Sequence, residues 1–221
     1  MESEKKEEAL LSKSKIKGFL KESFETITTA LILTFVIYYF ISTPNQVQGQ
    51  SMLPNVNPNE LILTNRIKHH LSKTPLATSL NQTYQRGDVI IFKLPNQEAF
   101  IKRIIALPGD EIGVCENNLI IDDKIVKEAY IPSDQPTFPA DFLRECEIKK
   151  IPDGSYAVFG DNRQHSLDSR SSQVGFVRQE YFIGPAFLRI LPLEKFGILK
   201  KGEYQESPIP EELKKKLTYD K

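Results

Sequence analysis

Apolar and polar positions divide the chain into one long apolar run and a series of short segments. No residue from 26 to 59 is charged, and residues 26–41 are almost wholly apolar. Extended to residues 24–42, this run just reaches the ~17 residues that a helix needs to cross a bilayer core. Pro44 then ends the helix. The pattern predicts a transmembrane anchor over residues 24–42, preceded by an N-terminal segment, residues 1–23.

Two other interpretations compete with an anchor. A cleaved secretory signal peptide has a short basic segment before its apolar run and a small-x-small site after it. Here the preceding segment is over twenty residues long, mixes acids with bases, and no such site follows. A buried core helix is the other interpretation, but the run shows no polar face. The anchor is therefore the favoured interpretation.

The charges beside the apolar run predict its orientation. Lysines precede it at Lys13, Lys15, Lys17 and Lys21, and no Lys or Arg follows until Arg66. Because positive flanks stay on the cytoplasmic side, we expect a cytoplasmic N-terminus. The rest of the chain then lies across the membrane, on the periplasmic or extracellular side of a plasma membrane. A thylakoid membrane facing its lumen is also possible.

Short β-branched or aromatic segments separated by Gly, Pro, Asp and Asn dominate the remaining chain. They are residues 61–64, 88–92, 99–107, 119–126, 155–159 and 181–190. Such segments with turn residues between them are typical of an all-β domain, and no long helical period competes. We therefore predict a mainly β fold, with a β-rich domain at residues 43–199.

Three segments lack strand patterns. Residues 65–85 are polar, so we expect a long loop in which His69 and His70 are solvated. Residues 127–152 are proline-rich and predict an excursion from the core. Residues 200–221 form a charged C-terminal tail, for which we expect a short helix at most and a solvated or frayed end.

One predicted strand, residues 99–107, carries two adjacent cations. Alternation places Lys102 and Arg103 on opposite faces, each between apolar neighbours. We expect one of them to be held in dry surroundings. Arginine stays charged when buried, whereas burial lowers a lysine pKa by up to ~3–5 units and makes it a general base. Taken alone, the pattern favours an edge strand whose cations both reach water.

A serine lies shortly after the apolar run, in residues 49–54, GQSMLP. Gly49 allows a sharp turn, and the backbone N–H of Ser51 is placed to help bind an oxyanion. The hydroxyl of Ser51 becomes a nucleophile only beside a base. Leu53 replaces the last glycine of G-x-S-x-G, so an α/β-hydrolase elbow is not supported. Alone, this segment also fits an ordinary turn.

The densest polar segment, residues 160–170 (GDNRQHSLDSR), follows the apolar strand at 155–159. We expect this segment to be held in shape by Asp–Arg ion pairs among Asp161, Arg163, Asp168 and Arg170. Ser166 is a candidate to orient the lysine amine. A rival base is His165, oriented by Asp168 or Asp161 as in a Ser-His-Asp triad. Its polar surroundings instead favour an exposed histidine.

Composition narrows the classes of function. Lys+Arg and Asp+Glu both number 29, so the formal net charge is zero, and nucleic-acid binding is not indicated. The two cysteines, Cys115 and Cys146, form no CxxC or Cys/His cluster, so no metal site is predicted. Sequence alone leaves open whether they form a disulfide or remain free thiols. No cofactor is indicated either.

Together these segments resemble the bacterial type I signal peptidases (leader peptidases), a Ser-Lys family. The resemblance lies in four ordered blocks after an anchor: residues 51–54 (SMLP), 86–92 (RGDVIIF), 102–110 (KRIIALPGD) and 160–170. The blocks and their spacing cover residues 24 to about 190. The resemblance implies an all-β catalytic domain of signal-peptidase type behind a single transmembrane helix.

The resemblance also implies an activity and roles for particular residues. Ser51 would be the nucleophile and Lys102 the general base of a serine endopeptidase that cleaves N-terminal signal peptides from exported preproteins. Ser166 would hydrogen-bond the lysine, and Asp168 with Arg170 would form a supporting ion pair. Substrates would have small residues at −1 and −3 and bind as an added β-strand. We expect a monomer whose partners are preprotein signal peptides and the lipid bilayer.

Two positions depart from the family pattern. Some members carry a serine hydroxyl at the position of Gly49 as a second oxyanion donor, so other donors must act here. Asn55 stands where threonine is usual.

Another class of function is a membrane-tethered, non-catalytic β module that binds peptides, with Ser51 inert. A self-cleaving Ser-Lys regulator shares the chemistry, but the membrane span argues against it.

Overall fold

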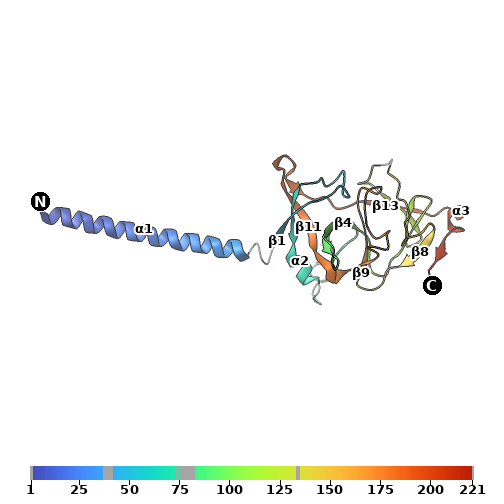
Figure 1. Cartoon of the computed structure of the whole chain (residues 1–221), viewed down its shortest axis with the longest axis horizontal. Coiled ribbons are helices and arrows are strands. Elements are labelled where there is room, and N and C mark those ends of the chain that lie inside the picture. The colour runs from blue at the N-terminus through green and yellow to red at the C-terminus, as the bar shows by residue number, and fades with distance from the viewer. Residues whose placement is uncertain (1, 37–41, 73, 75–82, 133–134, 221) are drawn as a thin grey trace. The chain divides into compact units, whose positions relative to one another are not determined.

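The computed structural model describes residues 2–36, 42–72, 74, 83–132 and 135–220, which are the coloured segments in Figure 1. The chain divides into two compact units, Met1–Ser42 and Thr43–Lys221. The first unit is the helix α1, Glu2–Val36.

The predicted anchor falls on the end of this helix. Residues 37–41 of the predicted span lie outside the described residues. Among the described residues, no helix combines the length and the apolar character needed to cross a bilayer.

The second unit is built from two β-sheets, as the mainly β prediction requires. The first sheet has the strand order β1-β2-β11-β3-β4-β9-β10, and β12 also pairs with β11. Its strands are β1 (Ser42–Gln46), β2 (Leu61–Asn65), β3 (Val89–Lys93), β4 (Ala99–Ala106), β9 (Ser155–Phe159), β10 (Val177–Arg178), β11 (Phe182–Leu191) and β12 (Gly197–Ile198). In Figure 1 the labels β1, β11, β4 and β9 mark this sheet.

The second sheet has the order β13-β7-β6-β5-β8-β14. Its strands are β5 (Glu111–Cys115), β6 (Asn118–Ile121), β7 (Lys124–Glu128), β8 (Glu147–Lys150), β13 (Tyr204–Pro208) and β14 (Thr218–Tyr219). The labels β13 and β8 lie at the opposite end of the β unit from β1 and β11 (Figure 1). Short helices complete the unit: α2 (Arg66–Leu71), η2 (Gln179–Tyr181), η3 (Leu193–Lys195) and α3 (Glu211–Lys214).

Buried apolar side chains join the two sheets. One cluster combines side chains from β4 and β9 of the first sheet, such as Ile105 and Phe159, with side chains from β5 to β7, such as Ile112 and Val126. Each such side chain, fully removed from water, contributes roughly 1.5–3 kcal/mol to folding. The shared core therefore packs β4, which carries both candidate cations, against the second sheet.

The predicted strands match observed ones except at residues 119–126. That run is divided into β6 and β7 by a tight turn at Asp122 and Asp123, which have φ angles of 49° and 55°. Two consecutive residues with positive φ make the hairpin turn whose twist matches antiparallel strands. The prediction also missed β1, β5, β8, β10 and β12, and β8 lies within the predicted excursion at residues 127–152. In β5, Gly113 interrupts the short apolar pattern.

The solvated-tail prediction for residues 200–221 does not match the fold. Residues 204–208 pair along the whole of β7, and β14 pairs in parallel with β8. The short helix α3 between them buries Leu213 against the second sheet. Backbone pairing does not require an apolar sequence, so a charged segment gives no sign of it.

Residues 65–85 are also more ordered than a long loop. Helix α2 begins after Asn65, whose side chain accepts a hydrogen bond from the Lys68 N–H and caps it. The prediction that His69 is solvated is wrong, because its ring is buried and its Nδ1 lies 3.0 Å from the Tyr84 hydroxyl. His70 is exposed, as predicted. Residues 73 and 75–82 of this segment lie outside the described residues.

Cys115 and Cys146 form a disulfide, which resolves the alternative that the sequence left open. The bond joins the end of β5 to the residue before β8, within the predicted excursion at residues 127–152. The excursion is therefore tied to the second sheet at this point.

Candidate active site

The candidate nucleophile lies in a turn held by buried apolar side chains. Ser51 follows Gly49, whose φ of 77° is a conformation that glycine adopts without strain. Met52 and Val56 anchor the turn in a core cluster of the first sheet, and the Val56 N–H donates to the Met52 carbonyl. A Cβ placed on Gly49 would meet no atom within 4 Å, so this side of the turn is open.

Lys102 points from β4 toward this turn. Its Nζ lies 2.7 Å from the Ser51 Oγ and 3.1 Å from the Ile101 carbonyl oxygen. The ring of Phe100, two residues away on the same face, has its centroid 5.4 Å from Nζ. Only 3% of Lys102 is exposed. The amine is therefore within hydrogen-bond reach of the candidate nucleophile and almost entirely out of water.

Burial lowers the pKa of the Lys102 ammonium to about 8. The carboxylates of Asp168 and Asp161 oppose the shift, because negative charge favours the protonated amine, and Arg170 adds to it. The net shift is downward because the removal of Lys102 from water lowers its pKa more than the two nearby carboxylates raise it. At pH 8 about half of the amine is thus neutral and able to accept a proton.

The loop after β9 holds the backbone of the nucleophile. The N–H of Asn162 donates to the Ser51 carbonyl at 2.9 Å, and its Nδ2 donates to the Gln50 carbonyl at 3.2 Å. Gly160 packs still closer, because a Cβ there would lie 2.4 Å from the Ser51 carbonyl oxygen. A side chain at residue 160 therefore cannot fit without moving the nucleophile.

Ser166 and the pair Asp168–Arg170 lie behind this contact. Arg170 donates from Nε and Nη2 to the two Asp168 oxygens at 2.8 and 2.9 Å, and the Gly160 N–H also donates to Asp168. Burial alone would raise the pKa of Asp168, but Arg170 outweighs it and holds that pKa below its ordinary value. The ion pair is thus present and charged.

The predicted hydrogen bond from Ser166 to Lys102 is not found. The Ser166 Oγ is buried and makes no hydrogen bond of ordinary geometry within the described residues. It packs against Gly160, where a Cβ would lie 2.3 Å away. It also lies close enough to Asp168 to help lower the pKa of that carboxyl.

The second cation of β4, Arg103, is buried as well, although only one dry cation was expected. Its Nε and Nη2 donate to the two oxygens of Asp161 at 2.9 and 2.7 Å. Asn55 Nδ2 donates to the same carboxylate at 2.9 Å. Because Asn55 follows Ser51 by four residues, this buried ion pair ties the lysine strand to the nucleophile segment.

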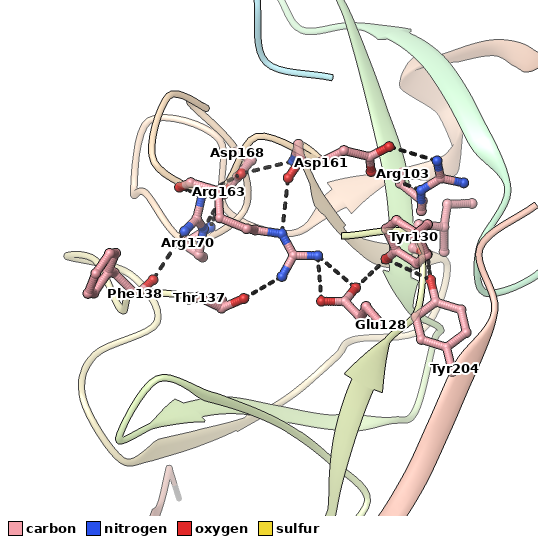
Figure 2. Close-up of polar contacts among 12 residues, drawn as sticks. Arg103, Glu128, Tyr130, Thr137, Phe138, Asp161, Arg163, Asp168, Arg170 and Tyr204 are labelled. Atoms are coloured by element: carbon pink, nitrogen blue, oxygen red, sulfur yellow. Dashed lines mark hydrogen bonds and ion pairs between the residues drawn. The ribbon is translucent and has the colours of Figure 1, made fainter. Parts of the chain in front are cut away.

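Arg163 completes the polar interior from the far side, as Figure 2 shows. Its Nη2 donates to Glu128 at 2.6 Å, its Nε donates to the Gly160 carbonyl, and its Nη1 donates to Thr137. In this interior, the two members of each ion pair come from different segments of the chain, except for Asp168 and Arg170. The expectation that Asp–Arg pairs close the loop internally is therefore correct only for that one pair.

Sequence reasoning did not single out Asn55, Glu128 and Asn162 as members of the site. Asn55 was noted only as a departure, and Asn162 lay within a quoted motif without an individual role. Glu128 lies in the segment 127–152, which was predicted to be an excursion from the core and was given no functional residue. Long-range pairing between charged residues leaves no local pattern. The rival base His165 is exposed, and the Ser51 hydroxyl meets Lys102 instead.

Among the described residues, metal-ligand side chains gather at Cys115, Glu145 and Cys146. Both sulfurs there are joined to each other in the disulfide, so they are not free thiolates for a metal ion.

Comparisons with known proteins identify the family of this chain. The family model described as signal peptidase, peptidase S26, matches residues 20–191. A probable signal peptidase I-2 of Synechocystis sp. is 33% identical over 190 residues, covering 83% of this chain and 78% of that protein. A signal peptidase I of Leptolyngbya laminosa is 31% identical, covering 85% and 88%. A signal peptidase I P of Bacillus subtilis subsp. natto is 29% identical, covering 81% and 93%. The chain therefore belongs to the signal peptidase family, peptidase S26.

Proposed function

We propose that this protein is a serine endopeptidase that cleaves signal peptides from exported preproteins with a Ser51–Lys102 dyad. The observation that carries the proposal is the buried Lys102 amine, 2.7 Å from the Ser51 hydroxyl and with a pKa of about 8. Serine needs a neighbouring base to attack a carbonyl, and a lysine kept out of water is such a base at ordinary pH. Family membership supplies the substrate class.

The mechanism follows from this geometry. Neutral Lys102 accepts the Ser51 proton as Oγ forms a bond to the scissile carbonyl carbon. Backbone N–H groups, including that of Ser51, stabilise the oxyanion. The Lys102 ammonium then gives its proton to the leaving amine as the peptide C–N bond breaks. Water hydrolyses the acyl-enzyme, again giving a proton to Lys102, and the Ser51 hydroxyl is regenerated.

The sheet leaves room for a substrate strand beside the dyad. Residues 99–103 pair with β3 on one side, whereas β9 pairs only with the later part of β4, from Arg103 to Ala106. On the β9 side, no described strand pairs with residues 99–102. An extended peptide added there gains main-chain hydrogen bonds and passes close to Ser51. Shallow pockets would then select small side chains at −1 and −3.

The proposal includes a membrane anchor at residues 24–42. In the described part of α1, large apolar side chains at Phe24, Ile27, Leu31 and Leu33 are all more than half exposed. Exposed apolar side chains around a helix suit a lipid environment and are costly in water. The lysines before residue 24 favour a cytoplasmic N-terminus, with the β unit across the membrane.

Cleavage of a model preprotein tests the activity. Detergent-solubilised full-length protein should cut it after the −1 residue, and Ser51→Ala should lower the rate at least about 10³-fold. Activity retained by Ser51→Ala would overturn the dyad, and cleavage by neither protein would overturn the peptidase function. A peptide-binding module, in contrast, would bind the preprotein equally well in both forms.

The pH dependence gives an independent test of the base. Because only the neutral amine accepts a proton, kcat/KM should rise with pH and level off above the Lys102 pKa of about 8. A profile measured between pH 6 and 10 should show this ionisation. A profile that is flat across that range would contradict Lys102 as the base.

A further inference from the structure

We propose that Tyr130 is a positioning residue for the Ser51–Lys102 dyad, acting through the Arg103–Asp161 ion pair and through Asn55. The proposal rests on the function proposed above. Tyr130 lies just after β7, in the segment 127–152 for which sequence reasoning assigned no role. Three parts of this residue, its ring, its backbone carbonyl and its hydroxyl, contact three parts of the site.

The aromatic ring of Tyr130 covers the guanidinium of Arg103, with the Arg103 Cζ 4.2 Å from the ring centroid. Arg103 is the neighbour of the general base along β4. Gly202 closes the packing from the C-terminal segment, because a Cβ there would lie 2.6 Å from the Tyr130 ring and 3.1 Å from Arg103. The ring thus excludes water from one side of the buried ion pair.

The backbone carbonyl of Tyr130 contacts the nucleophile segment. It accepts a hydrogen bond at 2.9 Å from Asn55 Nδ2, the same amide that donates to Asp161. Asn55 is thereby held between the Tyr130 backbone and the ion pair. A shift of Tyr130 would move the turn that carries Ser51.

The hydroxyl of Tyr130 contacts the loop after β9 indirectly. It donates to Glu128, whose carboxylate also accepts from Arg163, and Arg163 donates to the Gly160 carbonyl, as Figure 2 shows in part. Burial, and then the charge of Glu128, raise the pKa of Tyr130 well above its ordinary value, so the hydroxyl keeps its proton. Gly160 in turn packs on the Ser51 backbone.

The C-terminal segment supports the same ring. The hydroxyl of Tyr204 lies 3.3 Å from that of Tyr130 and donates to the Ile104 carbonyl of β4 at 3.2 Å. The two rings meet edge to face, with centroids 5.7 Å apart. Residues 202 and 204 lie outside the region matched by the family model, which ends at residue 191. The C-terminal segment thus adds a second support to the Tyr130 ring.

These contacts predict a loss of catalysis without a matching loss of substrate binding. A displacement of about 1 Å between a nucleophile and its base lowers a rate ~10²-fold. The proposed substrate strand lies along residues 99–102, whereas the hydrogen bonds and ring contacts described for Tyr130 reach Asn55, Arg103, Glu128 and Tyr204. Replacement of the ring should therefore lower kcat and leave KM nearly unchanged.

The experiment compares Tyr130→Leu, Tyr130→Phe and the control Leu213→Ala in full-length protein in detergent. For Tyr130→Leu we expect kcat to fall at least about tenfold with KM within about twofold. Tyr130→Phe keeps the ring and should retain kcat within about threefold. Leu213→Ala removes buried volume from the second sheet away from the polar interior, so it should lower Tm without changing kcat. Tyr130→Met replaces Tyr130→Leu where the latter does not fold.

A second readout does not depend on cleavage. NMR titration of ¹⁵N-labelled lysine side chains measures the Lys102 pKa directly. Displacement of the Ser51 turn in Tyr130→Leu should uncover the Lys102 amine and move this pKa upward from about 8, while Tyr130→Phe should leave it in place. Wild-type kcat and an unmoved Lys102 pKa in folded Tyr130→Leu would overturn the positioning role. Failure of the wild-type protein to cleave preprotein would instead overturn the proposed function, and the titration would still decide the role of Tyr130.

Discussion

At the scale of single residues, the chemistry of the site depends on where one amine lies. Lys102 is an ordinary strand residue in sequence, yet only 3% of it is exposed, and this burial lowers its pKa to about 8. Its neighbour Arg103 is equally buried but keeps its charge, because Asp161 pairs with it through two hydrogen bonds. Adjacent cations on opposite faces of one strand thus have different roles: one is available as a base, and the other joins segments.

The depressed pKa of Lys102 predicts a cost in stability. Below pH 8 the folded protein carries Lys102 as a buried ammonium. Between pH 8 and 10.5 this amine is neutral in the folded protein but still protonated in the unfolded chain. Folding stability therefore rises with pH across this range. Lys102→Met should therefore raise the free energy of unfolding by up to ~3 kcal/mol at pH 6, and the gain should vanish near pH 10.5. Urea unfolding at several pH values checks this. A gain that is independent of pH would contradict a depressed pKa.

Gly160 predicts a second effect at the residue scale. In Gly160→Ala the new Cβ would meet the Ser51 carbonyl oxygen at 2.4 Å and the Ser166 Oγ at 2.3 Å, so the nucleophile must move. We expect preprotein cleavage to fall about 100-fold or more.

Gly113→Ala is the matched control for Gly160→Ala. Its Cβ would meet the Ile148 Cδ1 at 2.5 Å and the Glu147 carbonyl oxygen at 2.7 Å, a comparable clash within the second sheet. This variant should lower Tm while the folded protein keeps its kcat. Wild-type cleavage by Gly160→Ala would show that the loop does not position Ser51.

At the scale of elements, β4 organises the site because it belongs to one sheet and packs against the other. Among the strands that the structure describes, only β3 pairs with its first half, which leaves an edge beside the dyad, while its second half also pairs with β9. The core shared with the second sheet immobilises the strand from behind. An element held on both faces keeps a catalytic side chain in place better than a loop does.

The disulfide acts at this scale too. It closes a loop of 31 residues between β5 and the segment before β8. The chain-entropy model assigns a loop of that length ~3–4 kcal/mol of stability. We expect the Cys115→Ala/Cys146→Ala double variant to lose about this much in urea unfolding, and reductant to have the same effect on the wild-type protein. Reductant should not affect the double variant, and a loss there would point to another cause.

At the scale of the whole molecule, the proposed anchor would confine a peptidase to the membrane from which its substrates emerge. The replacement of Leu31 and Leu33 by lysine tests this, because each charge at a helix centre costs ~2.5–3.5 kcal/mol on membrane-insertion scales. This double variant should be released from membranes by alkaline washing. The apolar control, Leu31→Ile with Leu33→Ile, should stay in the pellet with the wild-type protein. Wild-type protein released by the same wash would contradict the anchor.

The sequence by itself determined the mainly β class, the positions of strands such as β3, β4, β9 and β11, and the four ordered blocks that contain Ser51 and Lys102. It did so because strand alternation and turn residues are local, and because the family blocks can be recognised in order along the chain. The β6–β7 turn was missed although Asp122 and Asp123 interrupt the apolar run, because an Asp-Asp pair is not one of the strong local hairpin signals such as Asn-Gly or Asp-Gly.

Only the tertiary structure decided which charges meet. Asp161 pairs with Arg103 and Glu128 pairs with Arg163, across 58 and 35 residues of sequence. The place of Tyr130, the strands of residues 200–221 and the dryness of Lys102 are likewise set by segments that are distant in sequence. Burial and ion pairing depend on what surrounds a side chain in space, and a linear pattern carries no record of those surroundings.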